Sequence, residues 1–256
     1  MSVIRTDEWL LEHYEDPIAL CEKLTKHFAG ASAADIYDYF LRFGMYQPVE
    51  ERSDQLSGDV WEIVQEDVDH LIEEWDGPDI PIYIFPADQH NKWLQTQLGG
   101  KSGLAFHDKL FLFISPATTK EEIQAILTHE YNHVCRLNSL GKKEEEYTLL
   151  DTIVLEGIAE NAVTERLGRE LTAKWASLYS EKKIKKLWSR YIHPNQHILR
   201  QNRDYAAILY GHQKYPKMLG YCAGYQLVKI YMEKHSLSSK EMLTIEASSI
   251  AGGNYV

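Results

Sequence analysis

The chain has 256 residues, 44% hydrophobic and 25% charged, a composition typical of a globular protein with a sizeable core. Its formal net charge of −11 disfavours binding to nucleic acid or an anionic membrane, since both require a concentrated positive field. Residues 1–17 lack a basic stretch followed by a long apolar run, and no apolar run is long enough for a transmembrane helix, so we expect neither a secretory signal nor a membrane span. Three widely spaced cysteines predict no disulfide framework and a cytoplasmic location.

The first third of the chain is expected to be helical. Apolar residues recur there at helical spacing in three stretches, residues 17–30, 33–45 and 58–77. The string DGPDIP at residues 76–81 then breaks the pattern.

The composition changes after this break from helical to strand-like. Residues 81–85 (PIYIF) are β-branched and aromatic, which predicts a strand. Residues 103–106 (GLAF) and 110–115 (LFLFIS) predict a hairpin. The glycine-rich sequence LGGKSG before it is expected to be flexible.

Two central helices are expected next. Thr119 and Glu122 match a capping box that opens a helix extending to about residue 140, and a charged loop separates it from a second helix over residues 148–167. The remaining chain is mostly helical. This order predicts an α+β fold, mostly helical with a small mixed sheet beside the first central helix. We expect an N-terminal helical region, 1–78, and a second region, 79–256, that carries the chemistry; the two could form one compact unit.

The sequence HEYNH interrupts the apolar face of the first central helix. At about 100° per residue, His129 and His133 lie one turn apart on nearly the same side, so both imidazoles can point at one position. Glu130 lies further into the apolar arc, where an ionised carboxylate without a compensating charge is strongly destabilising. A divalent cation held by the two histidines would compensate it. This His-Glu-x-x-His pattern therefore predicts two metal ligands and a general base.

The second central helix also carries acidic residues on a face that is otherwise apolar. We predict Glu156 as the third ligand of a tetrahedral His, His, Glu zinc site with one open position. Glu160, one turn further, is predicted to accept a hydrogen bond from a ligand histidine and so orient its ring. Gly157 weakens the helix by about 1 kcal/mol relative to alanine, which we interpret as close approach of the two ligand-bearing helices.

Each of these motifs has a simpler explanation. A histidine pair at this spacing is often a solvated pair, and the alternative for Glu156 and Glu160 is a partly exposed helix edge. The coincidence of matching residues on two successive helices favours the metal site. His193 and His197 also lie four residues apart, but no acidic partner is evident, which favours a solvated pair.

Three segments resemble known zinc proteins. HEYNHVCRL, TLLDTIVLEGIAENAV and YCAGYQLV are similar to the YjaZ-type bacterial family of predicted Zn-dependent proteases, within the gluzincin group of metallopeptidases. The similarity covers about residues 81–233. It implies a zincin-like fold, one Zn²⁺ per chain and hydrolysis of peptide bonds.

The resemblance also suggests where an oxyanion and a substrate would bind. Related enzymes stabilise the oxyanion with a tyrosine or histidine from a later segment, and we favour Tyr221 over Tyr225 and His212. Zincins hold extended substrates along an edge strand, for which the best candidate comprises Gly103, Leu104, Ala105 and Phe106. The simpler alternative for that segment is one strand of a hairpin, and each tyrosine taken alone is more often a core residue.

Two further functions compete with a zinc peptidase. One is a zincin-like peptide-binding or regulatory module without turnover. The presence of Glu130 disfavours it, because a structural metal site needs no general base. The other is hydrolysis of a non-peptide amide. We expect a peptide or protein substrate, while the oligomeric state and cleavage specificity cannot be deduced from the sequence.

Overall fold

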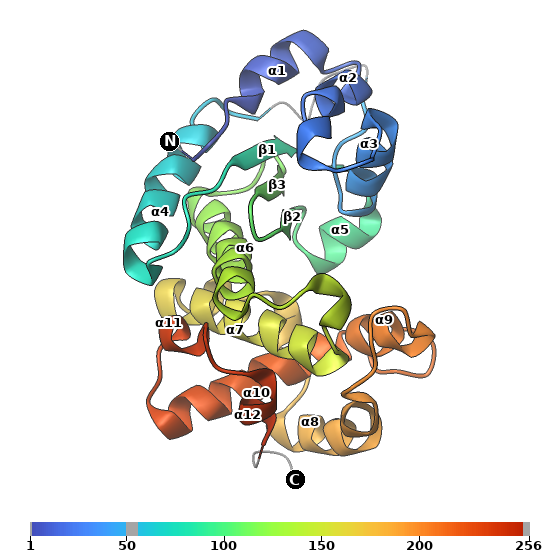
Figure 1. The fold of residues 1–256 in the computed structure, drawn as a ribbon, viewed down its shortest axis with the longest axis vertical. Helices are drawn as coiled ribbons and strands as arrows, with labels where there is room; N and C mark the ends of the chain where they lie inside the picture. The colour runs from blue at the N-terminus through green and yellow to red at the C-terminus, as the bar shows by residue number, and fades with distance from the viewer. Residues whose placement is uncertain (1, 50–55, 253–256) are drawn as a thin grey trace. The chain divides into compact units, whose positions relative to one another are not determined.

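The computed structural model describes residues 2–49 and 56–252, and Figure 1 shows the order of the elements. The chain divides into two compact units, Met1–Glu130 and Tyr131–Val256, and the division falls inside one continuous helix, α6 (Lys120–Leu140). Within the described residues, no helix combines the length and the apolarity needed to cross a lipid bilayer.

The helices of the first unit surround a small sheet. They are α1 (Thr6–His13), α2 (Pro17–Glu22), α3 (Ala33–Arg42), α4 (Val60–Trp75) and α5 (Lys92–Gln97). The helices expected at residues 33–45 and 58–77 are confirmed as α3 and α4. The helix expected over residues 17–30 is wrong beyond Glu22, where the chain leaves the helix and forms a 3₁₀ turn at Thr25–His27. Tertiary packing explains why α2 ends at Glu22, because the ring of Phe28 contacts those of Phe40, Phe106 and Phe111.

The sheet has three strands, β1 (Ile82–Pro86), β2 (Ser102–Ala105) and β3 (Leu110–Ile114), in the order β1-β3-β2. β1 runs parallel to β3, whereas β2 and β3 form the expected antiparallel hairpin. The prediction of a small mixed sheet is therefore confirmed. Among the described strands, β2 pairs with β3 only, so it forms an edge of the sheet.

The core of the first unit combines side chains from its helices and its sheet. All five residues of β1 and all five of β3 are buried, whereas burial alternates along β2. Leu20, Phe40, Phe85, Phe111 and Phe113 belong to one cluster of fully buried side chains. The short, aromatic strands are thus fixed by burial on both faces.

The two central helices begin at the expected residues. The backbone N–H of Glu122 donates to Thr119 Oγ1, and that of Thr119 donates to the Glu122 carboxylate, which confirms the capping box of α6. A second capping box, between Thr148 and Asp151, opens α7 (Leu149–Leu167). The first residues of both helices are therefore set by local sequence.

Every element that lies wholly within the described part of the second unit is a helix. After α7 this unit contains α8 (Glu181–Leu187), α9 (Arg203–Tyr210), α10 (Leu219–His235), α11 (Ser239–Met242) and α12 (Ala247–Ala251). α7 and α10 pack along each other and share one apolar core that includes Ile153, Ile158, Leu227 and Val228. This pairing places α10 directly beside the helix that carries Glu156.

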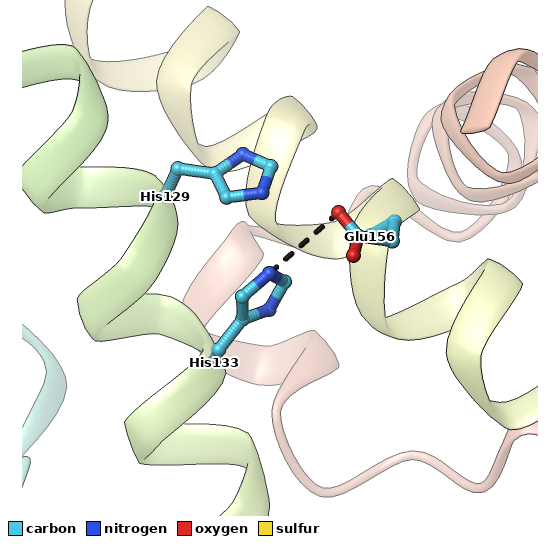
Figure 2. A group of neighbouring side chains, drawn as sticks. All are labelled: His129, His133 and Glu156. Atoms are coloured by element: carbon cyan, nitrogen blue, oxygen red, sulfur yellow. Dashed lines mark ion pairs between the residues drawn. The ribbon is translucent and has the colours of Figure 1, made fainter. Parts of the chain in front are cut away.

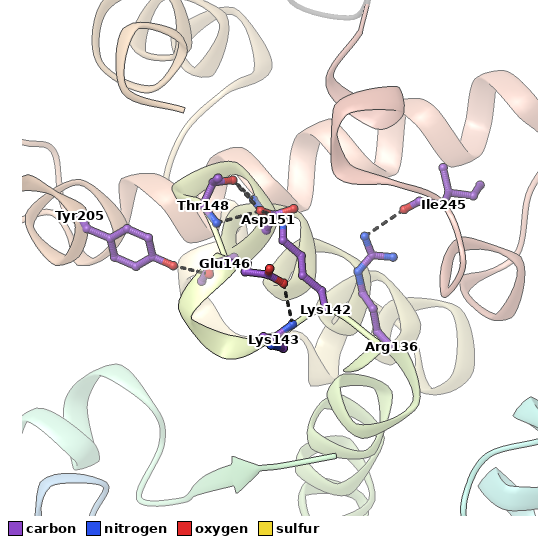
Figure 3. A network of polar contacts seen from close by, with 9 residues as sticks. Arg136, Lys142, Lys143, Glu146, Thr148, Asp151, Tyr205 and Ile245 are labelled. Carbon is purple, nitrogen blue, oxygen red and sulfur yellow. Dashed lines mark hydrogen bonds and ion pairs between the residues drawn. The ribbon is translucent and has the colours of Figure 1, made fainter. Parts of the chain in front are cut away.

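A polar network surrounds the loop between α6 and α7 (Figure 3). The Asp151 carboxylate accepts hydrogen bonds from Thr148 and from Lys142 Nζ, the latter at 2.6 Å. Arg136, which is 1% exposed, donates to the carbonyl oxygens of Met242, Leu243 and Ile245. These contacts fix the loop and attach the end of α6 to the segment between α11 and α12.

Candidate metal centre

The structure brings together the three predicted ligands. α6 places His129 and His133 one turn apart, and Figure 2 shows both imidazoles extending toward Glu156 on α7. One donor atom from each residue lies within 4.8 Å of the other two. His133 Nε2 is 3.6 Å from Glu156 Oε2. The three residues therefore form one cluster, as predicted from the two helix motifs.

The donors fit a zinc ion. Two imidazole nitrogens and one carboxylate oxygen are a donor set of catalytic zinc sites, which keep a fourth position open. Two ligand atoms bound tetrahedrally at about 2.0–2.1 Å lie about 3.3 Å apart. The 3.6 Å between His133 and Glu156 is close to that value. The remaining separations, up to 4.8 Å, require side-chain movements on the order of 1 Å.

Glu130 lies against the sheet. It is 8% exposed, and its carboxyl group faces Gly103 of β2. A Cβ atom added at Gly103 would lie 2.4 Å from Glu130 Cγ and 2.5 Å from Cδ. The prediction that the sheet lies beside the HExxH helix is therefore confirmed within the first unit.

Tyr221, the favoured oxyanion candidate, lies at the third ligand. Burial raises its pKa well above the usual value, and its hydroxyl takes part in hydrogen bonds with Glu156 and Tyr210. Its ring also packs against Trp175, with the ring centroids 5.1 Å apart. Tyr221 therefore lies beside Glu156, one of the three residues that could hold a metal ion.

The two other oxyanion candidates have different surroundings. The Tyr225 hydroxyl is 3.2 Å from Thr164 Oγ1, within hydrogen-bond distance. His212 is exposed, with its ring 6.0 Å from that of Tyr210. Neither residue has a contact with a predicted ligand among those that the structure describes.

Glu160 is buried one turn beyond Glu156. Its carboxylate accepts a hydrogen bond from the backbone N–H of Ala173, at the start of a 3₁₀ turn (Lys174–Ser177). This contact links α7 to the following segment. The expected role of Glu160 in orienting a ligand histidine stays a prediction.

The prediction that Gly157 marks a close approach between the two ligand-bearing helices is wrong. A Cβ at Gly157 would lie 2.3 Å from the carbonyl oxygen of Gly224, so the close neighbour is α10 and not α6. In return, a Cβ at Gly224 would lie 2.0 Å from the carbonyl oxygen of Ile153. Two glycines therefore allow the backbones of α7 and α10 to touch. This contact places Tyr221, three residues before Gly224, beside Glu156.

Tyr210 was not singled out from the sequence. It ends α9, is partly buried, and shares a hydrogen bond with Tyr221. The sequence contains 16 tyrosines and offers no local signal for this one, since the contact depends on the packing of α9 against α10.

The fold and the cluster define a mostly helical α+β protein in which two successive helices bring together a His, His, Glu cluster that could hold a metal ion. A family model described as "Predicted Zn-dependent protease (DUF2268)" matches residues 60–252, and the chain belongs to that family. It is 37% identical over 264 residues to "Uncharacterized protein YjaZ" of Bacillus subtilis (strain 168), covering 97% of this chain and 98% of the relative. No solved structure matches the chain significantly. The resemblance to the YjaZ-type family of predicted Zn-dependent proteases is confirmed.

Proposed function

We propose that the protein is a zinc-dependent peptidase. The observation that carries this proposal is the cluster of His129, His133 and Glu156, whose donor atoms lie within 4.8 Å of one another. The family description, a predicted Zn-dependent protease, supports the same reaction class. Glu130, adjacent to a ligand and largely buried, supplies a carboxylate that a purely structural metal site does not need.

The residues have separate roles in this proposal. A bound zinc ion supplies Lewis-acid chemistry, lowering the pKa of a coordinated water to about 7 and polarising a carbonyl. Glu130 accepts the proton of the attacking water and passes it to the leaving amine. His129, His133 and Glu156 hold the metal.

Tyr221 is proposed to donate a hydrogen bond to the oxyanion as it develops. Its position against Glu156 supports this role, because a donor must lie within a few ångströms of the reacting carbonyl. The alternatives Tyr225 and His212 lack such a contact with a ligand among the described residues.

Strand β2 is proposed to bind the substrate backbone. It is an edge strand, and Gly103 and Ala105 are its partly exposed positions. Main-chain pairing along an edge gives affinity with little sequence preference, so we expect a peptide or protein substrate of broad sequence. The proposed location is the cytoplasm.

The test combines metal analysis with one isosteric variant. We expect about one zinc per purified chain and loss of that zinc in His133→Ala. Wild type should cleave casein or a peptide library, whereas Glu130→Gln should retain zinc and lose cleavage, because the amide cannot accept the proton. Zinc retention without cleavage by wild type would instead favour a peptide-binding module, and a protein without zinc would contradict both.

A further inference from the structure

Strand β2 passes Glu130 at the one position where it has no side chain. Gly103 pairs with Leu112 of β3, and its two neighbours point to the opposite side of the strand, into the core. Leu104 belongs to the core of the first unit, and the Ser102 hydroxyl donates to the carbonyl of Phe43. β2 is therefore fixed both by its partner strand and by its buried face, and Gly103 cannot move away from Glu130 without breaking these contacts.

The backbone conformation of Gly103 does not require glycine. Unlike Gly44, which has a φ of +99°, Gly103 is outside the left-handed region and has ordinary strand pairing. The space for a side chain is instead taken by Glu130. An added Cβ would lie 2.4 Å from Cγ, 2.5 Å from Cδ and 2.8 Å from Oε1 of that residue.

We propose that Gly103 is a positioning residue that sets where the Glu130 carboxylate lies; this inference rests on the proposed function. Any Cβ at residue 103 must displace a neighbour. α6 and β2 are both held by backbone hydrogen bonds, whereas the Glu130 side chain can rotate. The carboxylate therefore moves while the fold stays intact, and the base leaves the position from which it accepts a proton.

The first experiment is Gly103→Ala, with Gly58→Ala as its matched control. Both glycines belong to the first unit and neither has a positive φ, but a Cβ at Gly58 meets nothing within 4 Å. We expect Gly103→Ala to keep one zinc per chain and to melt within about 2 °C of wild type, since a shift of 2–4 °C corresponds to roughly 1 kcal/mol. Its kcat should fall about 100-fold at nearly unchanged KM, because a displacement of about 1 Å in a reacting group has that effect. Gly58→Ala should match wild type in every measurement.

A rise in KM at unchanged kcat would overturn the inference, since Gly103 would then serve substrate binding alone. The second arm combines Gly103→Ala with Glu130→Ala, which removes Cγ, Cδ and both carboxylate oxygens of residue 130. On that background Gly103→Ala should lower kcat less than about 3-fold, because the atoms that it displaces are gone. A full additional 100-fold loss would overturn the inference.

Crystal structures of wild type and Gly103→Ala give a readout that needs no activity. A displaced Glu130 carboxylate over unchanged β2 and α6 backbones supports the inference, and an unmoved carboxylate refutes it. This arm also separates the two hypotheses, because a wild-type protein without peptidase activity defeats the proposed function while the displacement is still measured.

Discussion

Replacing Gly157 with alanine tests how α10 is held against the ligand-bearing helix α7. The added Cβ would lie 2.3 Å from Gly224 O and 2.9 Å from Val228 Cγ2, whereas ordinary contact begins at 3.4 Å. The shortfall of 1.1 Å, which is 3.4 minus 2.3, involves a backbone carbonyl, so no side-chain rotation can relieve it. The two helices must separate by about 1 Å or distort.

Two effects of opposite sign contribute to the free energy of unfolding. Overpacking a tight interface costs about 1–3 kcal/mol, and we take the upper part of that range, about 2–3 kcal/mol, because this interface is bordered by fully buried side chains that leave little room to relax. Alanine in place of a mid-helix glycine stabilises by about 1 kcal/mol. We expect a net destabilisation of about 1–2 kcal/mol, whereas helix propensity alone predicts a gain.

Urea denaturation followed by far-UV circular dichroism measures this difference, with Gly58→Ala as the unhindered control. Val228→Ala should not rescue the variant, because it removes only the side-chain contact and leaves the Gly224 carbonyl in place. Zinc affinity should also fall, since the displaced α10 carries Tyr221 away from Glu156. A Gly157→Ala protein as stable as wild type, or more stable, would refute the reasoning.

Three further predictions concern the metal and the network around the α6–α7 loop. Arg136→Met should lower the free energy of unfolding in urea by about 3 kcal/mol or more, because three carbonyls lose their buried donor; a change below about 1 kcal/mol would contradict this. Asp151 has its pKa held below 3.8, since hydrogen bonds from Lys142 and Thr148 outweigh the raising effect of burial. The ionised Asp151 therefore stabilises the folded protein above its unfolded pKa, and this stabilisation is lost as pH falls through the folded pKa. Asp151→Asn should have a lower free energy of unfolding than wild type at pH 7 and should lose less stability below pH 4. Equal losses of stability in wild type and Asp151→Asn on acidification would contradict this prediction. Chelation should lower the stability of the zinc-loaded protein by about 4 kcal/mol for a site saturated 1,000-fold above its Kd, while His133→Ala should be insensitive to chelator in a thermal melt.

Local signals in the sequence suffice for the central helices and the ligand set. Thr119 and Thr148 begin α6 and α7 through side-chain caps whose partners lie three residues away. His129, His133 and Glu156 follow from helical periodicity combined with the cost of burying charge. The hairpin of β2 and β3 is likewise visible as two apolar runs separated by the polar residues 107–109. These features were predictable because their causes lie within a few residues of each other.

Features that depend on contacts between distant segments were not predictable. Gly157 was recognised as a close-approach position, but its partner Gly224 lies 67 residues further along, and no local pattern connects them. α5 and α12 are five or six residues long and depend on tertiary packing more than on helix propensity. The contact of Gly103 with Glu130 joins a strand to a helix, so it follows only from the packed structure.

The three predicted ligands lie within a short part of the chain, from residue 129 to residue 156. The loop between α6 and α7, residues 141–148, is held by the hydrogen bond from Lys142 to Asp151. Bringing residues only 27 positions apart into contact carries a small entropic penalty and raises the relative contact order little. Capture of a metal ion by these three residues would therefore require two successive helices and not the whole polypeptide. A nascent chain that has reached the end of α7 already contains every proposed ligand, so a zinc ion bound there would link α6 to α7 before the later helices are synthesised.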